Sequence, residues 1–508
     1  MTRRSFLKSA SASTVALAGL SAAGAKNRPN IVVILSDDLG YGDVACYNPK
    51  SKIPTPELDR LAKEGLRFID AHTPCGVCSP TRYGLLTGRY PWRGDLKSQV
   101  LWPYDRPLIE DGRLTLPAML RSQGYATAAI GKWHLGWDWQ TTDGSKVNSQ
   151  VKLGDPQREI RNEFAKKVMW EKPAGGGPIT KGFDYYFGVD LPNFPPYTFI
   201  ENDRLTAAPS EQKPDKMFGW PGPMKPGWRL EGVLPELTRR AVKYVEEKSK
   251  SDKPFFLYFA MSSPHTPIAP DDDFKGKSGI GDYGDFVHQT DWSVGRVMDA
   301  IRASGKADNT IVVFTSDNGP ENLTYPVLKE TNHASQGPLR GAKRMLWEGG
   351  HRVPYIVWGP GRVPAGKTES EIVCHTDIMA TVASITGYKL PNNAGEDSYD
   401  ISAAWFGKKR SRAIREGTVH HSMNNEYALR QGEWVYIDSN GTHGPAEPEW
   451  WRERHGIKKH NEPGELFHLK EDLLEQKNLY SAYPDKVKQM KALLEKYKND
   501  SRSVPPRR

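Results

Sequence analysis

Cysteine is scarce in this chain, which has only four cysteines among 508 residues: Cys46, Cys75, Cys78 and Cys374. So few cysteines exclude a disulfide-built scaffold, although one structural disulfide stays possible if the protein is exported. Cys75 and Cys78 form a C-x-x-C pair, but a zinc site made of cysteines would need a second such pair, and the sequence has none. The cysteines therefore do not supply a framework for the fold.

The sequence also lacks any block of lysine and arginine, although its net charge is +9 and its pI is about 9.0. A nucleic-acid-binding arm would concentrate the basic residues, and no nucleic-acid-binding module is recognisable, so we expect no nucleic-acid partner. Hydrophobic residues make up 37% and charged residues 26%, which is typical of a soluble globular protein. A basic balance spread along the chain fits a polyanionic substrate without requiring one.

No apolar run near the N-terminus is long enough to span a bilayer, and we expect no membrane span. Residues 2–8 read T-R-R-S-F-L-K, like a twin-arginine export signal, and a short apolar stretch and small residues follow up to Ala25. We expect residues 1–25 to be a signal peptide and the mature protein to begin near Lys26. This predicts a bacterial protein that is periplasmic or secreted; a disordered basic tail is the alternative.

Three continuous apolar runs, residues 30–35, 254–259 and 310–315, predict strands that are buried on both faces. Amphipathic patterns that predict helices lie between these runs. Alternation of buried strands and helices predicts an α/β fold in which helices sandwich a mostly parallel central sheet. The expected helices cover residues 55–64, 114–123, 236–249 and 283–304.

The chain divides into a large unit and a small one. We expect residues 26–414 to form the α/β domain, in which residues 138–228, rich in glycine, proline and charge, form long loops over one face. Residues 415–508 should form a small antiparallel sheet with a terminal helix. The elements expected there are a hairpin over residues 427–437, a strand near 466–470 and a helix over 484–498.

Acidic and amide side chains follow two of the predicted strands. Asp37 and Asp38 come after the first run, and Asp317 and Asn318 come after the last. If these strands are neighbours, the four side chains converge beyond the carboxyl ends of the strands, where ligands bind in such sheets. Three carboxylates and an amide oxygen suit Ca²⁺ first and Mg²⁺ second. The alternative is ordinary turn chemistry, since Asp and Asn are common where strands end.

Cys78 begins the pentapeptide C-S-P-T-R, and the pattern that follows predicts a helix with Cys78 at its start. The start of a helix favours an anion through its free backbone N–H groups and its dipole. Arg82 lies one turn further on and can point the same way. The segment continues to L-L-T-G-R at Arg89, which makes the motif highly specific.

These motifs resemble those of the type I sulfatases, the arylsulfatase-like enzymes of the alkaline phosphatase superfamily. The resemblance runs from about residue 30 to about residue 478. It implies an alkaline phosphatase-like fold, hydrolysis of a sulfate ester, and a maturation enzyme that oxidises Cys78 to formylglycine, with Arg82 supporting the modified residue. The calcium ligands that it implies are Asp37, Asp38, Asp317 and Asn318, together with the modified Cys78.

Three further segments resemble that family. Residues 131–136 read G-K-W-H-L-G, which implies that Lys132 contacts the sulfate and that His134 contacts the formylglycine. The P-H-T-P segment around His265 implies that this histidine faces the sulfate ester. Lys343 precedes a W-E-G-G-x-R-V-P segment, and the resemblance puts it near the bridging oxygen.

The resemblance also implies an order of events. One hydroxyl of the hydrated formylglycine, activated by the metal and by Asp317, attacks sulfur while Lys132 and Lys343 meet the charge on the sulfuryl oxygens. His265, helped by Lys343, protonates the leaving alcohol. His134 then deprotonates the second hydroxyl, sulfate leaves and the aldehyde is restored.

The aromatic-rich loops and the basic balance favour a sulfated saccharide as the substrate. Similarity to bacterial polysaccharide sulfatases predicts a 6-O-sulfate on galactose or N-acetylgalactosamine. Two alternatives stay open, namely a phosphonate monoester hydrolase or phosphodiesterase of the same superfamily, and a non-catalytic sulfoglycan-binding protein. Five residues that lie near the motifs are candidates for sugar contacts: Arg93, Trp137, Asp138, His288 and His333.

Overall fold

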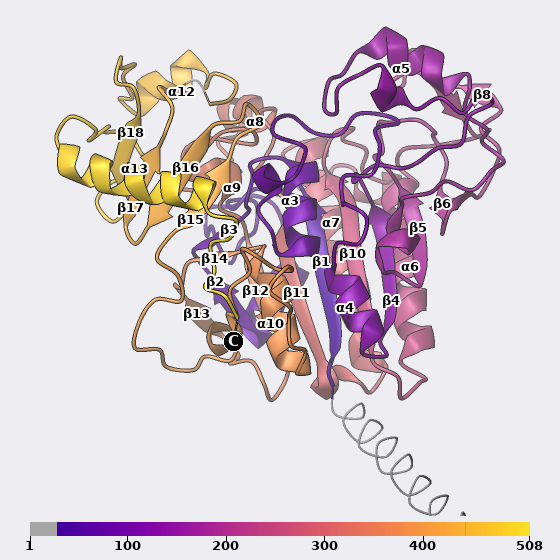
Figure 1. The fold of residues 1–508 in the computed structure, drawn as a ribbon, viewed down its shortest axis with the longest axis horizontal. Coiled ribbons are helices and arrows are strands. Elements are labelled where there is room, and N and C mark those ends of the chain that lie inside the picture. The colour runs from indigo at the N-terminus through magenta and orange to yellow at the C-terminus, as the bar shows by residue number, and fades with distance from the viewer. Residues whose placement is uncertain (1–27, 442, 508) are drawn as a thin grey trace, which may run out of the picture.

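The computed structural model describes residues 28–441 and 443–507, so the predicted signal peptide, residues 1–25, lies outside the described part. A large α/β unit built on a ten-stranded sheet occupies most of the chain, and a four-stranded sheet follows near the C-terminus (Figure 1). The predicted fold class is therefore confirmed. Among the described residues, no helix is both long enough and apolar enough to cross a membrane.

Five parallel strands form the centre of the large sheet, and antiparallel strands flank them on both sides. Every residue of β1 (Asn30–Asp37) is buried, as expected for an apolar run covered on both faces. The strands β1 and β11 pair directly, which was the condition for their polar ends to converge. In spatial order the strands are β13 (Lys367–Glu369), β2 (Leu66–Phe68), β12 (Tyr355–Trp358), β11 (Thr310–Ser316), β1 (Asn30–Asp37), β10 (Phe255–Pro264), β4 (Ala126–Lys132), β5 (Tyr185–Val189), β6 (Ile200–Glu201) and β7 (Arg204–Leu205).

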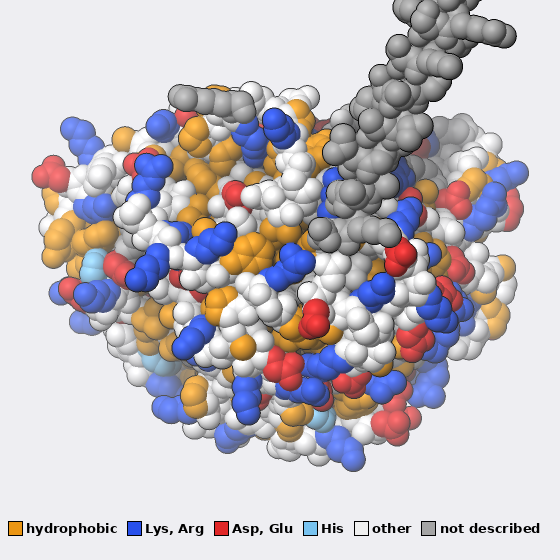
Figure 2. Space-filling view, turned by 90° about the horizontal axis from the view of Figure 1, so that it is seen from below, with side chains coloured by type: hydrophobic (Ala, Val, Ile, Leu, Met, Phe, Trp, Pro, Cys, Tyr) orange, Lys and Arg blue, Asp and Glu red, His pale blue; other side chains and the backbone are white. Residues whose placement is uncertain are grey.

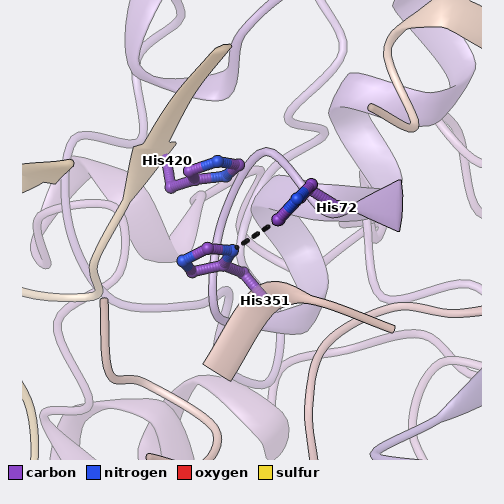
Figure 3. A group of neighbouring side chains, drawn as sticks. All are labelled: His72, His351 and His420. Carbon is purple, nitrogen blue, oxygen red and sulfur yellow. Dashed lines mark hydrogen bonds between the residues drawn. The ribbon is translucent and has the colours of Figure 1, made fainter. Parts of the chain in front are cut away.

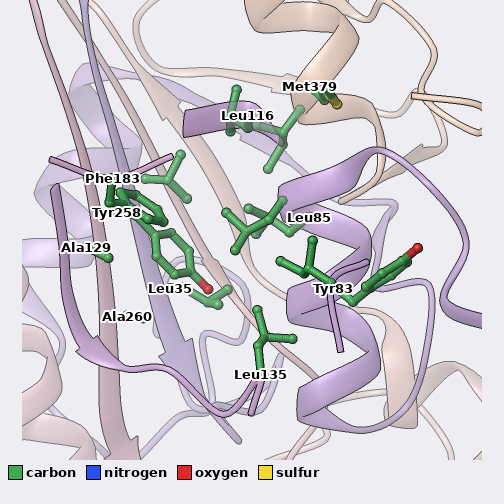
Figure 4. Close-up of a cluster of buried hydrophobic side chains, with 14 of the residues drawn as sticks. Leu35, Tyr83, Leu85, Leu116, Ala129, Leu135, Phe183, Tyr258, Ala260 and Met379 are labelled. Atoms are coloured by element: carbon green, nitrogen blue, oxygen red, sulfur yellow. The ribbon is translucent and has the colours of Figure 1, made fainter. Parts of the chain in front are cut away.

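Helices cover both faces of this sheet, and each face has its own apolar core. Leu35 of β1 lies in the first core with Leu85 and Leu116 (Figure 4), whereas Ile34 points into the second. The four predicted helices correspond to α2, α4, α6 and α7. Residues of α3 (Cys78–Thr87), α4 (Leu116–Ser122) and α10 (Asp377–Thr386) line the first core, and residues of α2 (Pro56–Glu64), α6 (Val233–Lys248) and α7 (Asp282–Ala303) line the second.

The segment 138–228 is only partly made of loops, which corrects the expectation from the sequence. It contains α5 (Arg158–Ala165) and, more importantly, β5, which extends the parallel sheet beside β4. The Y-Y-F-G-V run of β5 is short, and the glycine-rich and proline-rich stretches on either side of it hide the strand pattern. The segment also contains two short antiparallel pairs, β6 with β7, and β8 (Glu211–Gln212) with β9 (Pro223–Met224).

The small antiparallel sheet and terminal helix of the predicted fold class are present in the C-terminal part. Their apolar core also includes Tyr90 and Trp92 of the α/β unit, so the two units pack together. The sheet has the order β15 (Thr418–His421), β16 (Tyr427–Gln431), β17 (Trp434–Ile437) and β18 (Glu465–His468), followed by α13 (Pro484–Asn499). The remaining short elements are β3 (Ala71–His72) paired with β14 (Val373–Cys374), α8 (Thr324–Thr331), α9 (Glu348–His351), α11 (Ser402–Trp405) and α12 (Glu449–Arg454).

Figure 2 shows the molecule from below, the end at which β1 begins. On this face the lysine and arginine side chains are scattered among acidic and apolar ones. The net charge of +9 is therefore not gathered into one basic field on this side of the protein.

Candidate active site

Five neighbouring parallel strands each deliver polar side chains to one edge of the sheet, because the carboxyl ends of parallel strands meet there. The edge gathers residues that lie far apart in the sequence. In spatial order, the residues at or just past the strand ends are Asp317 and Asn318 (β11), Asp37 and Asp38 (β1), His265 (β10), Lys132 and His134 (β4) and Asp190 (β5).

Cys78 is the first residue of α3 and is only 2% exposed. Burial raises the pKa of its thiol, and the nearby carboxylates of Asp317 and Asp37 add to this, whereas Lys132 and Lys343 act in the opposite direction. These four charged neighbours place Cys78 inside the strand-end cluster. The helix start also presents free backbone N–H groups, which favour an anion.

Two lysines pair with the two aspartates at the end of β1. Lys132 Nζ lies 2.7 Å from Asp37 Oδ2, and Lys343 Nζ lies 2.7 Å from Asp38 Oδ1. Burial alone would raise the pKa of Asp38, but Lys343 and other cations outweigh it and lower this pKa. Burial also opposes the charge on Lys343, but Asp38 outweighs it and the pKa of Lys343 is raised. Both groups are therefore charged at neutral pH.

Arg82 forms a third buried ion pair. Its Nε and Nη2 atoms donate to Asp317 Oδ2 at 3.0 and 2.7 Å, and its Nη1 atom donates to the backbone oxygen of Lys132 at 3.0 Å. The guanidinium therefore ties α3 to the ends of β11 and β4. Burial raises the pKa of Asp317 and the charge of Asp37 adds to this, while Arg82 lowers it.

The oxygen atoms at the ends of β1 and β11 fit a divalent cation. Asn318 Nδ2 donates to Asp38 Oδ1 at 2.7 Å, and Asn318 Oδ1 is buried without a hydrogen-bond partner. A cation would satisfy that oxygen. Side-chain oxygens of Asp37 and Asp38 lie within 4.8 Å of one another, close enough to share an ion. Carboxylate and amide oxygens are ligands suited to Ca²⁺ or Mg²⁺.

His134 offers a proton-accepting nitrogen to the cluster. Its Nε2 atom lies 2.9 Å from the backbone oxygen of Leu101, and because a carbonyl only accepts, Nε2 carries the hydrogen. The lone pair is therefore on Nδ1, which is buried without a hydrogen-bond partner. Burial and the charge of Lys132 lower the pKa of His134 to about 3, so the ring is neutral near pH 7.

His265 faces the cluster from the end of β10. Its Nδ1 atom donates to the backbone oxygen of Thr266, and its Nε2 atom lies 3.8 Å from Asp38 Oδ2. Burial and the charge of Lys343 lower the pKa of His265 well below its usual range. An anion that neutralises Lys343 would remove part of this effect.

Comparison with known proteins agrees with this geometry. The family model for sulfatases matches residues 29–388. The chain belongs to the sulfatase family. An N-acetylgalactosamine-6-O-sulfatase of Bacteroides thetaiotaomicron is 32% identical over 93% of both chains, and human arylsulfatase A is 32% identical over 75% of this chain and 69% of its own. A solved structure from work on the metabolism of multiple glycosaminoglycans by Bacteroides thetaiotaomicron is 29% identical in sequence to this chain. The two structures superpose with a TM-score of 0.77, over 93% of this chain and 100% of the other.

Family membership makes this sulfatase a sulfuric ester hydrolase. Sulfatases generally use a formylglycine and a divalent metal. The strand-end oxygens described above fit such a metal. Cys78 lies beside two of the carboxylates, Asp37 and Asp317, and beside the lysines Lys132 and Lys343.

The structure does not bring Arg93 of the sulfatase to the cluster, which corrects its assignment as a sugar contact. Its Nε donates to Asp397 Oδ2 at 2.8 Å, its Nη2 donates to the backbone oxygen of Tyr497 at 3.0 Å, and its guanidinium lies over the ring of Trp92. Arg93 therefore holds α13 against the α/β unit. Closeness to a motif in sequence did not mean a place in the site, because Asp397, Tyr497 and Trp92 occupy the Arg93 side chain.

His333 and His288 are also engaged elsewhere. His333 Nδ1 accepts from the backbone N–H of Lys52, so its Nε2 donates to Asp43 Oδ1 at 2.9 Å, and the ring is fully buried. His333 thus supports the loop that follows β1. His288 Nδ1 lies 2.9 Å from the backbone oxygen of Pro54. The assignment of His333 as a sugar contact is corrected, because these bonds bury it within the fold. His288 is only partly buried, and its assignment stays a prediction.

Trp137 and Asp138 lie beside the sulfatase cluster rather than in it. Trp137 is 2% exposed and its Nε1 donates to Asp190 Oδ1 at 3.2 Å. Asp138 Oδ1 lies 2.5 Å from Lys146 Nζ at the surface. Both residues line a surface cavity of about 600 Å³, so they stay candidates for contact with a distant part of a long substrate.

Two residues of the site were missed at the sequence level. Asp190 accepts from the backbone N–H of His134 at 3.1 Å, and Glu321 Oε2 lies 3.8 Å from Lys343 Nζ. The sequence positions of both could have identified them. Asp190 directly follows the aromatic run of β5, and Glu321 lies four residues after Asp317.

Proposed function

We propose that this sulfatase hydrolyses the 6-O-sulfate of N-acetylgalactosamine or galactose in a sulfated saccharide. The name of the Bacteroides relative supports this sugar and this position, because the two chains align over 93% of their lengths. The canine N-acetylgalactosamine-6-sulfatase, 31% identical over 77% of this chain, supports it as well.

The observation that carries the proposal is the convergence of three buried cations beside Cys78. Lys132 and Lys343 reach the cluster from the end of β4 and from the loop before α9, and Arg82 reaches it from α3. In the proposal, the two lysines bind the sulfate oxygens, on which charge develops during transfer. Arg82 holds Asp317 and the start of α3 in place.

Residue 78, once oxidised to formylglycine by a maturation enzyme, supplies the nucleophilic hydroxyl of its hydrate. Asp37, Asp38, Asp317 and Asn318, with residue 78, would hold the metal, Ca²⁺ first and Mg²⁺ second, which supplies positive charge to the sulfuryl oxygens.

Two histidines handle protons in this proposal. His134 presents a neutral ring with its Nδ1 lone pair free, so it accepts a proton from a hydroxyl of residue 78. His265 presents Nε2 to the cluster, so it protonates the leaving alcohol. The incoming sulfate ester neutralises part of the positive charge of Lys343 and thereby favours the protonated form of His265.

Sulfate release from defined saccharides tests the substrate. The wild-type protein should release sulfate from N-acetylgalactosamine 6-sulfate or galactose 6-sulfate at least about tenfold faster, in kcat/KM, than from the 4-sulfated isomers, because specificity is differential transition-state binding. Equal rates on the isomers, or turnover of a phosphonate monoester alone, would contradict the proposal.

Cys78→Ala tests the nucleophile. Its turnover should fall by at least about a thousandfold while binding of the sulfated sugar persists, because the nucleophile is lost and the cations remain. Cys46→Ala, at a half-buried cysteine outside the cluster, is the matched control and should keep wild-type activity. Peptide mass analysis should find the aldehyde at residue 78 of the active enzyme, and full activity with an unmodified thiol would sink the mechanism.

We further propose that the protein is exported through the twin-arginine pathway to the periplasm or the medium of a bacterium. Arg3 and Arg4 and the small residues up to Ala25 support this. Replacing both arginines by lysine should leave the protein in the cytoplasm of a host with this pathway. Unchanged export of the double variant would contradict the proposal.

A further inference from the structure

Three buried histidines outside the active site make a contact that needs no ligand. His72 of β3, His351 of α9 and His420 of β15 meet in the interior (Figure 3). Asp70 Oδ1 lies 2.6 Å from His72 Nε2, so this carboxylate balances the charge of a protonated His72 ring. The protonated ring then donates from its Nδ1 atom to His351 Nδ1 at 3.1 Å, the contact drawn dashed in Figure 3. Uncompensated charge lies instead at the surface of the C-terminal unit.

The C-terminal unit contains a surface cavity of about 780 Å³ that is lined mainly by cations. This volume lies within the range of about 300–1,000 Å³ that is typical of pockets for small ligands. We call this cavity the basic pocket. Its lysine and arginine residues are Arg340, Arg452, Lys458, Lys459 and Lys477.

The acidic residues among the described residues that line the basic pocket are Glu447 and Glu465, and both are already paired. Glu447 Oε2 accepts from Arg340 Nε and Nη2 at 3.1 and 2.9 Å. Glu465 accepts from Trp347 Nε1 at 3.1 Å, and its other oxygen lies 2.9 Å from His460 Nε2. Neither carboxylate is therefore available to the remaining cations of the pocket.

Four cations of the basic pocket have no carboxylate partner. Arg452, Lys458, Lys459 and Lys477 form no ion pair with any part of the chain that the structure describes. Cations that share a cavity without partners repel one another, and a bound anion would replace this repulsion by attraction. The charge of the pocket therefore favours an anionic ligand.

Two nitrogen atoms at the basic pocket are buried without a hydrogen-bond partner, Arg452 Nε and His460 Nδ1. The guanidinium of Arg452 is always protonated, so its Nε atom is a donor. The hydrogen bond to Glu465 raises the pKa of His460, which favours a hydrogen on Nδ1 as well. Buried donors without partners are costly, and an anionic oxygen in the pocket is the kind of acceptor that would satisfy them.

The basic pocket and the catalytic cluster share one loop. Arg340 and Trp347 line the pocket, and Lys343, which lies between them in the sequence, reaches Asp38 in the cluster. The helix α12, whose residue Arg452 also lines the pocket, lies at the upper end of the molecule, toward which the carboxyl ends of the central strands point (Figure 1). The pocket is therefore at the same end of the molecule as the active site.

We propose that the basic pocket binds an anionic group, a sulfate or a carboxylate, on a sugar of the substrate chain other than the sugar that is hydrolysed. The proposal rests on the proposed function, because it takes the substrate to be a sulfated saccharide. Anionic groups recur along such a chain, so a second one is available to the pocket. The substrate class is then a polyanionic chain, which the enzyme binds more tightly than a single sulfated sugar.

Two matched double variants test the pocket. Chains of alternating uronic acid and 6-sulfated N-acetylgalactosamine, chondroitin 6-sulfate, are titrated by calorimetry into the Cys78→Ala enzyme. Adding Lys458→Ala and Lys459→Ala should raise Kd by about fivefold and make binding less sensitive to salt, because two exposed charge contacts are lost. The control adds Lys408→Ala and Lys409→Ala, two adjacent exposed lysines outside the pocket, and should leave Kd unchanged.

Equal losses of affinity in the two double variants would show that only net charge matters and would overturn the proposal. So would a loss of binding to phosphatidylglycerol vesicles while chain binding stays unchanged, because the pocket would then serve a membrane surface. Repeating the titration with 4-sulfated chains separates this proposal from the proposed function. The lysine pair of the pocket should contribute equally there, whether or not the enzyme releases 6-O-sulfate.

A single substitution tests the buried donor. Arg452→Lys keeps the charge but removes the Nε–H group, and it should raise Kd for the chains by about tenfold, as expected for the loss of one charge-assisted hydrogen bond. Arg454→Lys is the control, because the Arg454 guanidinium lies over the ring of Trp450 instead. Unchanged affinity in Arg452→Lys would contradict the proposed contact.

Discussion

The buried charges around Cys78 occur as matched pairs, and this explains how so many of them can be buried together. The pair of Arg82 with Asp317, for example, is 0% exposed on both side chains. Removing one partner of such a pair leaves an uncompensated charge, at a cost of about 3–5 kcal/mol. The cluster is therefore maintained at a cost in stability, as expected when side chains are arranged for chemistry rather than for folding.

Replacement of Arg82 by lysine should lower activity more than it lowers stability. Lysine keeps the charge but cannot bond Asp317 and the backbone oxygen of Lys132 at once, so α3 and Cys78 should shift relative to the strand ends. We expect kcat to fall by about a hundredfold, because a displacement of reacting groups by about 1 Å has an effect of this size. Arg113→Lys, which also disturbs ion pairs but outside the site, should keep its activity; equal losses in both variants would contradict this role.

Removal of divalent cations should abolish activity. Ca²⁺ should restore it better than Mg²⁺, because Ca²⁺ accepts carboxylate and amide oxygens in a flexible geometry, whereas Mg²⁺ requires near-octahedral geometry. Asn318→Ala removes the unpartnered oxygen and should weaken Ca²⁺ binding by at least about tenfold, since each ligand contributes to affinity. The shift of Tm with Ca²⁺ concentration measures this affinity independently of turnover. A wild-type calcium response in Asn318→Ala would contradict the ligand assignment.

At the scale of elements, glycine lets the strands approach where the site is assembled. Gly131 in β4 has a φ of 121°, and a Cβ placed there would lie 1.8 Å from the backbone oxygen of Ala260 in β10. A Cβ on Gly188 in β5 would lie equally close, 1.8 Å, to the backbone oxygen of Gly131. The close approach fixes the direction in which the next residue, Lys132, leaves the sheet.

Gly131→Ala should therefore disturb both the sheet and the site. The added methyl group must push β4 from β10, and we expect a loss of several kcal/mol in stability together with weaker substrate binding through a displaced Lys132. Gly124→Ala is the matched control, because Gly124 also has a positive φ, 89°, but open space around its Cβ. It should cost only about 1 kcal/mol and leave KM unchanged; thermal unfolding and steady-state kinetics compare the two.

The elements that the sequence predicted best are those whose signal is local. The apolar run of β1 and the periodicity of α7 identify a strand and a helix without knowledge of any partner. The pairing of strands is not local, so β5 and the residue after it, Asp190, were missed although they complete the edge. The same reason explains the errors at Arg93 and His333, whose partners come from chain segments hundreds of residues away.

At the scale of the whole molecule, the C-terminal sheet is joined to the α/β unit through a buried carboxylate. Glu465 of β18 accepts from Trp347 Nε1 at 3.1 Å and lies 2.9 Å from His460 Nε2 and 3.4 Å from His443 Nε2. Trp347 belongs to the loop that carries Lys343 into the active site. A displacement of the small sheet would therefore move Lys343 in the active site as well as the contact between the two units.

The stability contributed by Glu465 should depend on pH. Burial raises its pKa, but the hydrogen bonds from His443 and His460 outweigh this and bring it to about 2, below its usual value of 4.5. A lowered pKa stabilises the folded state above pH 4.5, and this stabilisation is lost as the pH falls toward 2. Glu465→Gln should therefore lower the free energy of unfolding at pH 7 by on the order of 3 kcal/mol, and lower the Tm with it. The difference in Tm between this variant and the wild type should shrink between pH 4.5 and pH 2.

A matched substitution separates this effect from a general response to acid. The Glu471 side chain is 80% exposed and lies 3.8 Å from His468 Nδ1 in the same unit, so Glu471→Gln removes an equal charge without a buried partner. Its Tm should follow that of the wild type at every pH, because exposed ion pairs contribute about 0–1 kcal/mol. A gap between wild type and Glu465→Gln that stayed constant down to pH 2 would mean that packing of the side chain, rather than its charge, joins the two units.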